Sequence, residues 1–160
     1  MKITIAAVGK LRRGPYADLC DDYIGRGQNL ARGLGLSGPV LIEVEAPKSL
    51  SGDALKAREG ELLINAVPEK ATIFLLDEHG KNLSSVGLKT ELQHCRETNI
   101  PEIAFIIGGA DGLSDELKRR AVKTFAFGAA TWPHMLVRVM LTEQIYRAMT
   151  IMTGHPYHRV

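Results

Sequence analysis

The last eight residues carry side chains that could bind a nucleic acid or move a proton. Thr153-Gly154-His155-Pro156-Tyr157-His158-Arg159-Val160 contains two histidines, a tyrosine and an arginine. Histidine and tyrosine rings can stack on an unpaired base, histidine can also accept a proton, and arginine can contact a phosphate. His155 and His158 have no carboxylate or thiolate nearby in the sequence, which argues against a metal site. The alternative is a tail that packs on its own subunit.

A second candidate is a glycine-rich segment between an apolar run and the start of a helix. Gly108-Gly109-Ala110-Asp111-Gly112 follows the apolar run 103–107 and precedes Ser114, a good helix N-cap residue. Ligands of parallel α/β sheets bind beyond the carboxyl ends of the strands, and glycine lets a ligand approach the backbone. A tight strand-to-helix turn with positive φ is the alternative explanation of these glycines.

Two further loops have the same setting. Leu76-Asp77-Glu78-His79-Gly80 ends the apolar run 71–76, and Phe127-Gly128-Ala129-Ala130-Thr131-Trp132-Pro133 follows the short run 124–127. Three such loops could surround a neutral or cationic ligand with main-chain hydrogen bonds, and none offers the basic groups that a polyphosphate requires. The Gly-x-Gly-x-x-Gly at residues 33–38 follows a predicted helix and leads into Pro39, so it is not a dinucleotide fingerprint.

The elements that must position these loops alternate along the chain. Short apolar runs predict strands at residues 2–8, 40–44, 71–76, 103–107 and 124–127. Helices are predicted at residues 15–32, 53–67 with Asp53 as the cap, 85–99 after Ser84 or Ser85, 114–122 with Ser114 as the cap, and from His134 onward. This alternation predicts an α/β fold, a mostly parallel open sheet with helices on both faces, in which the run 103–107 is central.

Composition agrees with a single globular domain. The 160 residues are 45% hydrophobic and 24% charged, which excludes a disordered, collagen-like or coiled-coil chain. The net charge is only +2, but residues 1–37 and 108–160 each carry +3 and the middle carries −4. Cys20 and Cys95 are too few for a disulfide framework, and no apolar run is long enough to be a signal peptide or a membrane span. We therefore expect a cytoplasmic protein.

The predicted helix from His134 to about residue 152 is apolar on nearly every face. Its only charged residues are Arg138, Glu143 and Arg147. A helix that is apolar all round must be buried, so a partner subunit is expected to cover one face. The alternative is a central core helix of a single chain.

Several of these segments together resemble the bacterial ribosomal large-subunit methyltransferases of the SPOUT superfamily, which methylate N3 of a pseudouridine in 23S rRNA. The resemblance covers the whole chain, including Ala7-Val8-Gly9-Lys10 at its start. It is carried by Ile107-Gly108-Gly109-x-x-Gly112, by Thr131-x-Pro133-His134-x-Leu136-x-Arg138-Val139-x-Leu141-x-Glu143-Gln144-x-Tyr146-Arg147-Ala148, and by His155-Pro156-Tyr157-His158. Trp132 departs from the smaller or aliphatic residue typical of that family.

The resemblance implies one SPOUT domain over residues 1–160, with a deep trefoil knot near its carboxyl end and a homodimer packed through the knot region. It implies S-adenosylmethionine as the cofactor, 23S rRNA within the ribosome as the partner, and neither a metal nor a membrane. The implied cofactor contacts are Leu76, Gly108, Phe127, Gly128, Ala129, Ala130, Thr131 and Trp132.

The resemblance also suggests how methyl transfer would work. A base must remove the weakly acidic N3 proton, and His158 or His155 is the candidate. Tyr157 would stack on the ring, while Arg138 and Arg159 would hold phosphate or the developing negative charge. We expect the tail 153–160 of one subunit to complete the pocket of the other. Two rival functions remain, a SPOUT methyltransferase acting on tRNA and a non-enzymatic, nucleotide-responsive α/β domain.

Overall fold

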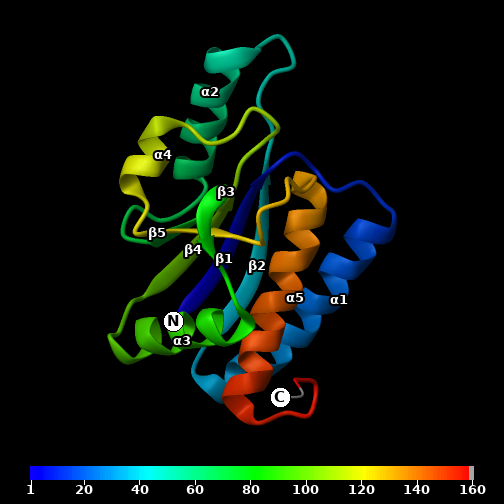
Figure 1. Ribbon diagram of the computed structural model, residues 1–160, viewed down its shortest axis with the longest axis vertical. Helices are drawn as coiled ribbons and strands as arrows, with labels where there is room; N and C mark the ends of the chain where they lie inside the picture. The colour runs from blue at the N-terminus through cyan, green and yellow to red at the C-terminus, as the bar shows by residue number, and fades with distance from the viewer. Residues whose placement is uncertain (159–160) are drawn as a thin grey trace.

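The computed structural model, which describes residues 1–158, is built on a five-stranded sheet in the order β2-β1-β4-β3-β5 (Figure 1). Every strand pair within it is parallel, and β4 is central, so both predictions are confirmed. The elements are β1 (Lys2–Val8), α1 (Pro15–Ala31), the 3-10 turn η1 (Arg32–Leu34), β2 (Ser37–Val44), α2 (Gly52–Asn65), β3 (Thr72–Asn82), α3 (Ser85–Glu97), β4 (Glu102–Ile107), α4 (Asp115–Arg120), β5 (Lys123–Ala126) and α5 (His134–Thr153).

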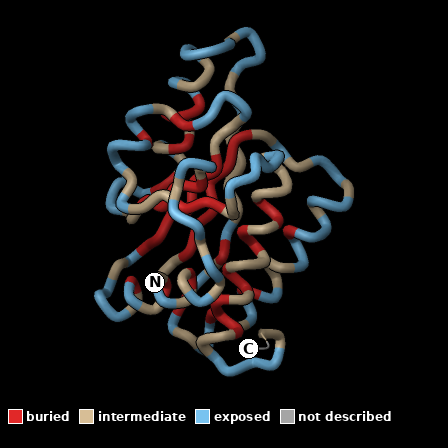
Figure 2. The backbone as a smooth tube through the Cα atoms, in the orientation of Figure 1, coloured by how far each residue is buried: buried red, intermediate tan, exposed pale blue. Residues whose placement is uncertain are grey.

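The helices cover both faces of the sheet, as predicted. Helices α1, α3 and α5 pack on one face, and α2 and α4 pack on the other. Alternate residues of each strand supply the two cores, because successive side chains of a strand point to opposite faces. In β4, for example, Phe105 lies in the core under α5, whereas Ile106 lies in the core under α2 and α4. The sheet is therefore buried on both sides (Figure 2).

Two of the predicted helix caps are confirmed and one is wrong. The hydroxyl oxygens of Ser84 and Ser114 accept hydrogen bonds from the N–H groups of Gly87 and Leu117. Asp53 lies inside the first turn of α2, where its negative charge still favours the helix N-terminus, and Ser51 occupies the N-cap position.

Strand β3 is longer than the sequence predicts, because it continues past Leu76 and crosses over β5. Phe125 of β5 is in register with both Leu76 and Lys81 of β3. A Cβ on Gly80 would lie 2.6 Å from the Phe125 carbonyl carbon, so only glycine allows the two backbones to cross this closely. The segment after Leu76 therefore lies across β5 rather than forming a free loop.

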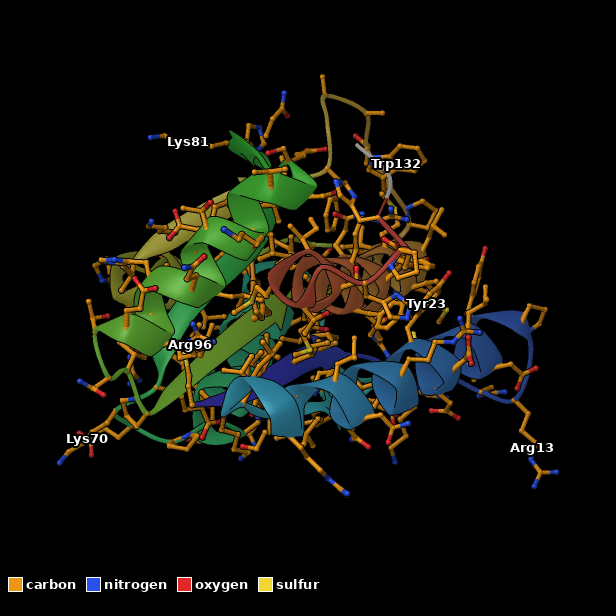
Figure 3. The ribbon with its side chains drawn as sticks, turned by 90° about the horizontal axis from the view of Figure 1, so that it is seen from below. Arg13, Tyr23, Lys70, Lys81, Arg96 and Trp132 are labelled. Atoms are coloured by element: carbon orange, nitrogen blue, oxygen red, sulfur yellow. The ribbon has the colours of Figure 1, made fainter. Side chains whose placement is uncertain are left out.

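Most of the apolar surface of α5 is buried within its own chain. The helix lies between α1 and α3 on the sheet, and its buried residues include Leu141, Ile145 and Met149. The core-helix alternative thus accounts for these positions without a partner. A groove of about 260 Å³ remains between α1 and α5, lined in part by Leu19, Tyr23 and Met140. Tyr23 lies beside α5 in Figure 3, with its ring centroid 6.1 Å from that of Tyr146.

Candidate active site

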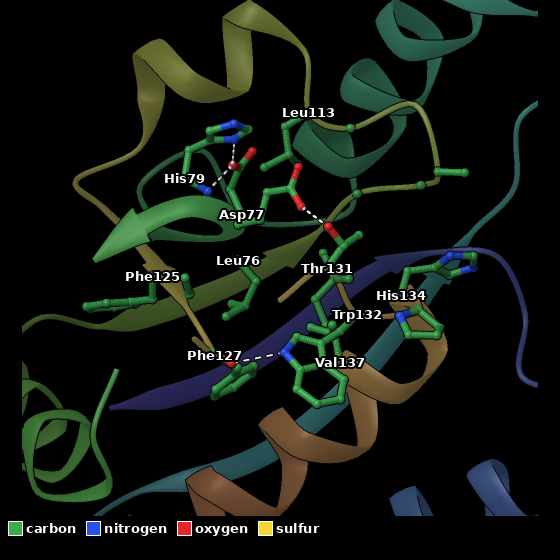
Figure 4. A pocket seen from close by; sticks show the side chains of 18 of the residues that line it. Leu76, Asp77, His79, Leu113, Phe125, Phe127, Thr131, Trp132, His134 and Val137 are labelled. Carbon is green, nitrogen blue, oxygen red and sulfur yellow. Dashed lines mark hydrogen bonds and ion pairs between the residues drawn. The ribbon is translucent and has the colours of Figure 1, made fainter. Parts of the chain in front are cut away.

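The three loops singled out in the sequence line one cavity of about 700 Å³ (Figure 4). They leave β3, β4 and β5, whose carboxyl ends lie at the same edge of the parallel sheet. The first residues of α5 form another wall, contributed by His134 and Val137. The cavity is thus a direct consequence of the strand order.

The loop after β4 brings the backbone itself to the cavity. A Cβ on Gly108 would lie 3.0 Å from both the Gly112 carbonyl oxygen and Leu113 Cδ2, so a side chain has little room there. Gly112 has φ +84° and donates its N–H to the carbonyl oxygen of Gly109 at 3.1 Å. The glycines therefore form a tight turn and also bring main-chain groups to the cavity. Ligand binding and a tight turn, the two explanations of this segment, are compatible with each other.

The part of β3 that follows Leu76 is held by its own acidic side chain. Asp77 Oδ1 accepts a hydrogen bond from the His79 N–H at 2.9 Å and lies 3.0 Å from His79 Nδ1 (Figure 4). Burial opposes ionisation of Asp77, but the two His79 contacts and nearby Lys118 outweigh it and lower the pKa of Asp77. Asp77 therefore stays ionised and fixes the turn that follows Leu76.

The loop after β5 is closed by side chains at both ends. Trp132 Nε1 donates to the Phe127 carbonyl oxygen at 3.0 Å, and Thr131 Oγ1 donates to Glu78 Oε2 at 2.6 Å (Figure 4). The first bond connects the two ends of the loop, and the second joins the loop to the part of β3 that follows Leu76. Trp132, the residue that departs from the family pattern, therefore has a structural role in shaping the cavity.

The predicted cofactor residues lie together, with one exception. Ala129 does not line the cavity. The residues that do line it are Leu76, Gly108, Phe127, Gly128, Ala130, Thr131 and Trp132.

The charge of the cavity differs from the sequence expectation. Lys56 of α2 and Lys118 of α4 reach its lining, although the three loops themselves carry no lysine or arginine there. Their contribution is opposed by the carboxylates of Asp77, Glu78 and Asp111. Sequence spacing gave no signal for the two lysines, because they come from helices that reach the site only through the fold.

His134 is one of two histidines in the cavity wall, the other being His79. Burial lowers the pKa of His134, and the nearby Arg138 charge lowers it further. The imidazole is therefore neutral at pH 7. The Pro133-His134 pair was part of the resemblance, and this motif was the available signal for its place in the site.

The described part of the C-terminal tail, up to residue 158, does not line the cavity of its own chain. The tail follows the last turn of α5, whereas the cavity is built around the first turn (Figure 1). The helix has 20 residues, which at 1.5 Å per residue is about 30 Å. One chain therefore holds the predicted cofactor residues and the predicted tail residues at opposite ends of α5.

Tyr157 packs on α5, in agreement with the alternative of a tail docked on its own subunit. Its hydroxyl donates to Glu143 Oε1 at 3.0 Å, and its ring lies 4.7 Å from the Arg147 guanidinium carbon and 4.8 Å from the Tyr146 ring. Burial, with hydrogen bonds to Tyr23 and Glu143, raises the pKa of Tyr157. The phenol is therefore protonated and acts as a donor.

The two tail histidines differ in their surroundings. His155 is exposed, and its Nδ1 accepts the Tyr157 N–H at 3.2 Å, which leaves Nε2 free for another contact. His158 is half-buried, and its Nδ1 has no partner among the described residues. Arg159 lies outside the described residues.

Arg138 is not placed where it could meet a phosphate in the cavity. Its side chain is fully buried, and it bonds Glu43 Oε1 at 2.5 Å and the Val8 carbonyl oxygen at 2.8 Å. These contacts join α5 to the ends of β1 and β2. In the described chain Arg138 thus supports the packing of α5, and its predicted contact with substrate stays a prediction.

Comparison with known proteins decides the family. A family model described as "Predicted SPOUT methyltransferase" matches residues 1–158. The chain belongs to the SPOUT methyltransferase family. This confirms the resemblance seen in the sequence.

Full-length relatives of this SPOUT methyltransferase are named ribosomal RNA large subunit methyltransferase H. Those from Rhodospirillum centenum and Rhodopseudomonas palustris (strain BisA53) are 49% and 43% identical, each alignment covering 99% of both chains. The one from Dinoroseobacter shibae is 48% identical over the whole of both chains.

A crystal structure of a probable methyltransferase from Bordetella pertussis Tohama I has the same fold. It aligns with a TM-score of 0.51 at 10% identity, covering 92% of this SPOUT methyltransferase and 95% of the other chain. At this identity the match supports the fold alone. In residues 1–158 no helix meets the length and apolarity of a membrane span, and no cluster of three metal-binding side chains is found.

Proposed function

We propose that this SPOUT methyltransferase uses S-adenosylmethionine to methylate N3 of a pseudouridine in 23S rRNA of the large ribosomal subunit. The names of its full-length relatives support the rRNA substrate. The observation that carries the proposal is the cavity at the carboxyl ends of β3, β4 and β5, whose lining includes the glycines and alanines of the loops after β4 and β5. Such a lining suits a ligand recognised by backbone hydrogen bonds.

The charges around the cavity fit S-adenosylmethionine, whose sulfur is positively charged. Asp77, Glu78 and Asp111 outnumber Lys56 and Lys118, and His134 is neutral. A cation is therefore not repelled by the site as a whole. When bound, the cofactor supplies a methyl group on its sulfonium sulfur.

The crossing of β3 over β5 supports a trefoil knot. Gly80 packs directly on the backbone of Phe125, and the Leu83 N–H bonds the Ala126 carbonyl oxygen at 2.9 Å. The chain after Ala126 then continues into the cavity loop and α5. We propose that this later segment passes through the loop formed by the earlier crossing.

The separation of cavity and tail supports a homodimer with shared active sites. A two-fold dimer that packs through the groove beside α5 can place the tail of one copy at the cavity of the other. Tyr16 and Leu19 are each 43% exposed on α1, and they offer apolar surface for such packing. Residues 1–160 then act as one domain whose tail 153–160 completes the partner's site.

The tail residues provide the acid–base chemistry in this arrangement. His158 or His155 would accept the N3 proton and so leave the nitrogen lone pair available for the methyl group that bound cofactor would supply. The ring of Tyr157 positions the uracil ring, and Arg159 holds the adjacent phosphate. Arg138 supports the site indirectly, because its contacts with Glu43 and Val8 anchor α5 to β2 and β1.

A basic loop lies at the same edge of the sheet and can hold the RNA. Lys10, Arg12 and Arg13 follow β1, whose carboxyl end is next to that of β4. Arg13 projects away from the body of the protein in Figure 3. This loop can therefore contact phosphates around the target nucleotide without entering the cavity.

The test is methyl transfer to three RNAs by the wild-type protein. Intact ribosomal subunits, free 23S rRNA and tRNA are each incubated with labelled S-adenosylmethionine, and the methylated nucleoside is identified. We expect N3-methylated pseudouridine in 23S rRNA. Transfer to tRNA alone would replace this substrate, and absence of S-adenosylmethionine binding in calorimetry would overturn the enzymatic function.

A further inference from the structure

Helix α2 meets the glycine loop (residues 108–112) through an unusually close contact. A Cβ on Gly109 would lie 2.7 Å from Glu59 Oε2 and 3.0 Å from Glu59 Oε1. One residue further along α2, a Cβ on Gly60 would lie 2.2 Å from Ser114 Oγ, the cap of α4. Gly60 on α2 and Gly109 in the glycine loop have no side chains, and this allows α2 to pack directly against the loop and the start of α4.

The side chain that makes this contact, Glu59, is a buried carboxyl group with an unpaired oxygen. Glu59 is only 7% exposed, and its buried Oε2 has no hydrogen-bond partner among residues 1–158. Burial raises the pKa of Glu59, and the negative charge of Asp111 in the glycine loop raises it further. Of the two cations nearest to it along α2, Arg58 pairs with Glu61, and Lys56 is directed to Asp53 and to the cavity.

Stability does not explain a carboxyl group at this position. An unpaired buried acceptor destabilises the folded state, and an apolar side chain of similar volume would fill the space without that penalty. Glu59 does not line the cavity either, so it cannot touch a ligand there. It does lie directly behind Gly109, whose neighbour Gly108 forms the cavity wall.

We propose that Glu59 is a positioning residue for the cofactor, acting through Gly109. Its unpaired Oε2 accepts a hydrogen bond from a main-chain N–H of the glycine loop when S-adenosylmethionine occupies the cavity. The bond holds the loop in the shape that its opposite face requires for the ligand. This inference rests on the proposed function, since it assigns Glu59 to the same cofactor site.

Two substitutions separate the acceptor from the bulk of the side chain. Glu59→Met keeps the volume and removes the oxygens, whereas Glu59→Gln keeps one oxygen that can accept the bond. Glu61→Gln is the matched control, because Glu61 is exposed on the same helix and pairs with Arg58. Calorimetric titration with S-adenosylmethionine, thermal unfolding, and methyl transfer at saturating cofactor are measured for each variant.

We expect Glu59→Met to weaken cofactor binding about tenfold, the effect of one lost hydrogen bond to a charged group. Its methyl-transfer rate at saturating cofactor stays within about twofold of wild type, because Glu59 touches neither substrate nor the reacting atoms. Its unfolding temperature is unchanged or raised. Glu59→Gln binds cofactor nearly as well as wild type, and Glu61→Gln is indistinguishable from it.

Wild-type affinity in Glu59→Met would overturn the inference, and so would a Glu59→Gln variant as weak as Glu59→Met. A Glu59→Met variant with weakened binding and a lowered unfolding temperature would also overturn it, because it would show a merely structural role. These outcomes are distinct from failure of the proposed function, in which the wild-type protein itself would not bind S-adenosylmethionine.

Discussion

The two ends of α5 differ in what they supply to the proposed active site. The amino end borders a cavity built from segments that follow three neighbouring strands, and this cavity holds the predicted cofactor residues. The carboxyl end carries Tyr157, His155 and His158, which do not line that cavity. A pocket can thus be built by sheet topology alone, whereas the reactive groups are attached to a short tail. In the dimer proposed above, a second copy brings its tail to the cavity.

The largest effect is expected from the tail. His158→Ala removes the proposed base and should reduce methyl transfer at saturating cofactor roughly a thousandfold. Its affinity for S-adenosylmethionine, measured by calorimetry, should stay at the wild-type value. His94→Ala is the control, since His94 is an exposed histidine on α3. A His158→Ala variant with an unchanged rate would remove His158 from the chemistry.

A substitution at the cavity end of α5 is expected to weaken cofactor binding, whereas the substitution in the tail leaves binding unchanged. Gly108→Val places a branched side chain against Gly112 and Leu113, and it should weaken S-adenosylmethionine binding about a hundredfold, or ~2.7 kcal/mol. Gly33→Val is the control, because a Cβ on Gly33 meets no atom within 4 Å. Calorimetry on both variants gives the comparison. Full affinity in Gly108→Val would show that the cofactor binds elsewhere.

The sequence predicted what depends on local pattern and strand order. The apolar run 103–107 indicated the central strand, Ser84 and Ser114 marked helix starts, and the glycines after β4 marked the cavity. It could not predict contacts that depend on close passage of distant backbone. The crossing at Gly80 extends β3 across β5, and nothing in the periodicity of the segment distinguishes this from a loop.

The sequence also could not predict which side chains from other helices reach the cavity. Lys56 and Lys118 reach the cavity from α2 and α4. The family resemblance suggested Arg138 as a substrate contact, and nothing in the sequence indicated its partner Glu43, which is 95 residues away in the chain. A buried charge is explained only when its partner is known, and that partner is a property of the fold.

A smaller effect should follow from loosening the tail without removing its ring. Tyr157→Phe deletes the hydrogen bond to Glu143 but keeps the contact with Arg147, so the tail is held less firmly. Loss of one such bond, about 1 kcal/mol, should reduce methyl transfer about fivefold. Tyr16→Phe on the exposed surface of α1 is the control. A loss as large as that of His158→Ala would assign the hydroxyl a direct part in the chemistry.

The smallest effect is a pH dependence at the cavity end. Because the pKa of His134 is lowered in the folded state, the unfolded chain binds a proton more readily below about pH 6.5, and stability falls as the pH falls. His134→Gln should lose less stability than wild type between pH 7 and about pH 5.5. Denaturant unfolding at both pH values measures this. Parallel losses in wild type and variant would show that His134 is not buried in its neutral form.

Mixed dimers test the central claim, that one active site is built from two chains, most directly. A His158→Ala subunit and a Gly108→Val subunit are coexpressed with different tags, and the heterodimer is isolated. It contains one intact cavity facing one intact tail. At a cofactor concentration near the wild-type Kd it should therefore methylate 23S rRNA at about half the wild-type rate, although each homodimer is nearly inactive under these conditions. A heterodimer as inactive as the two homodimers would show that cavity and tail act within a single chain.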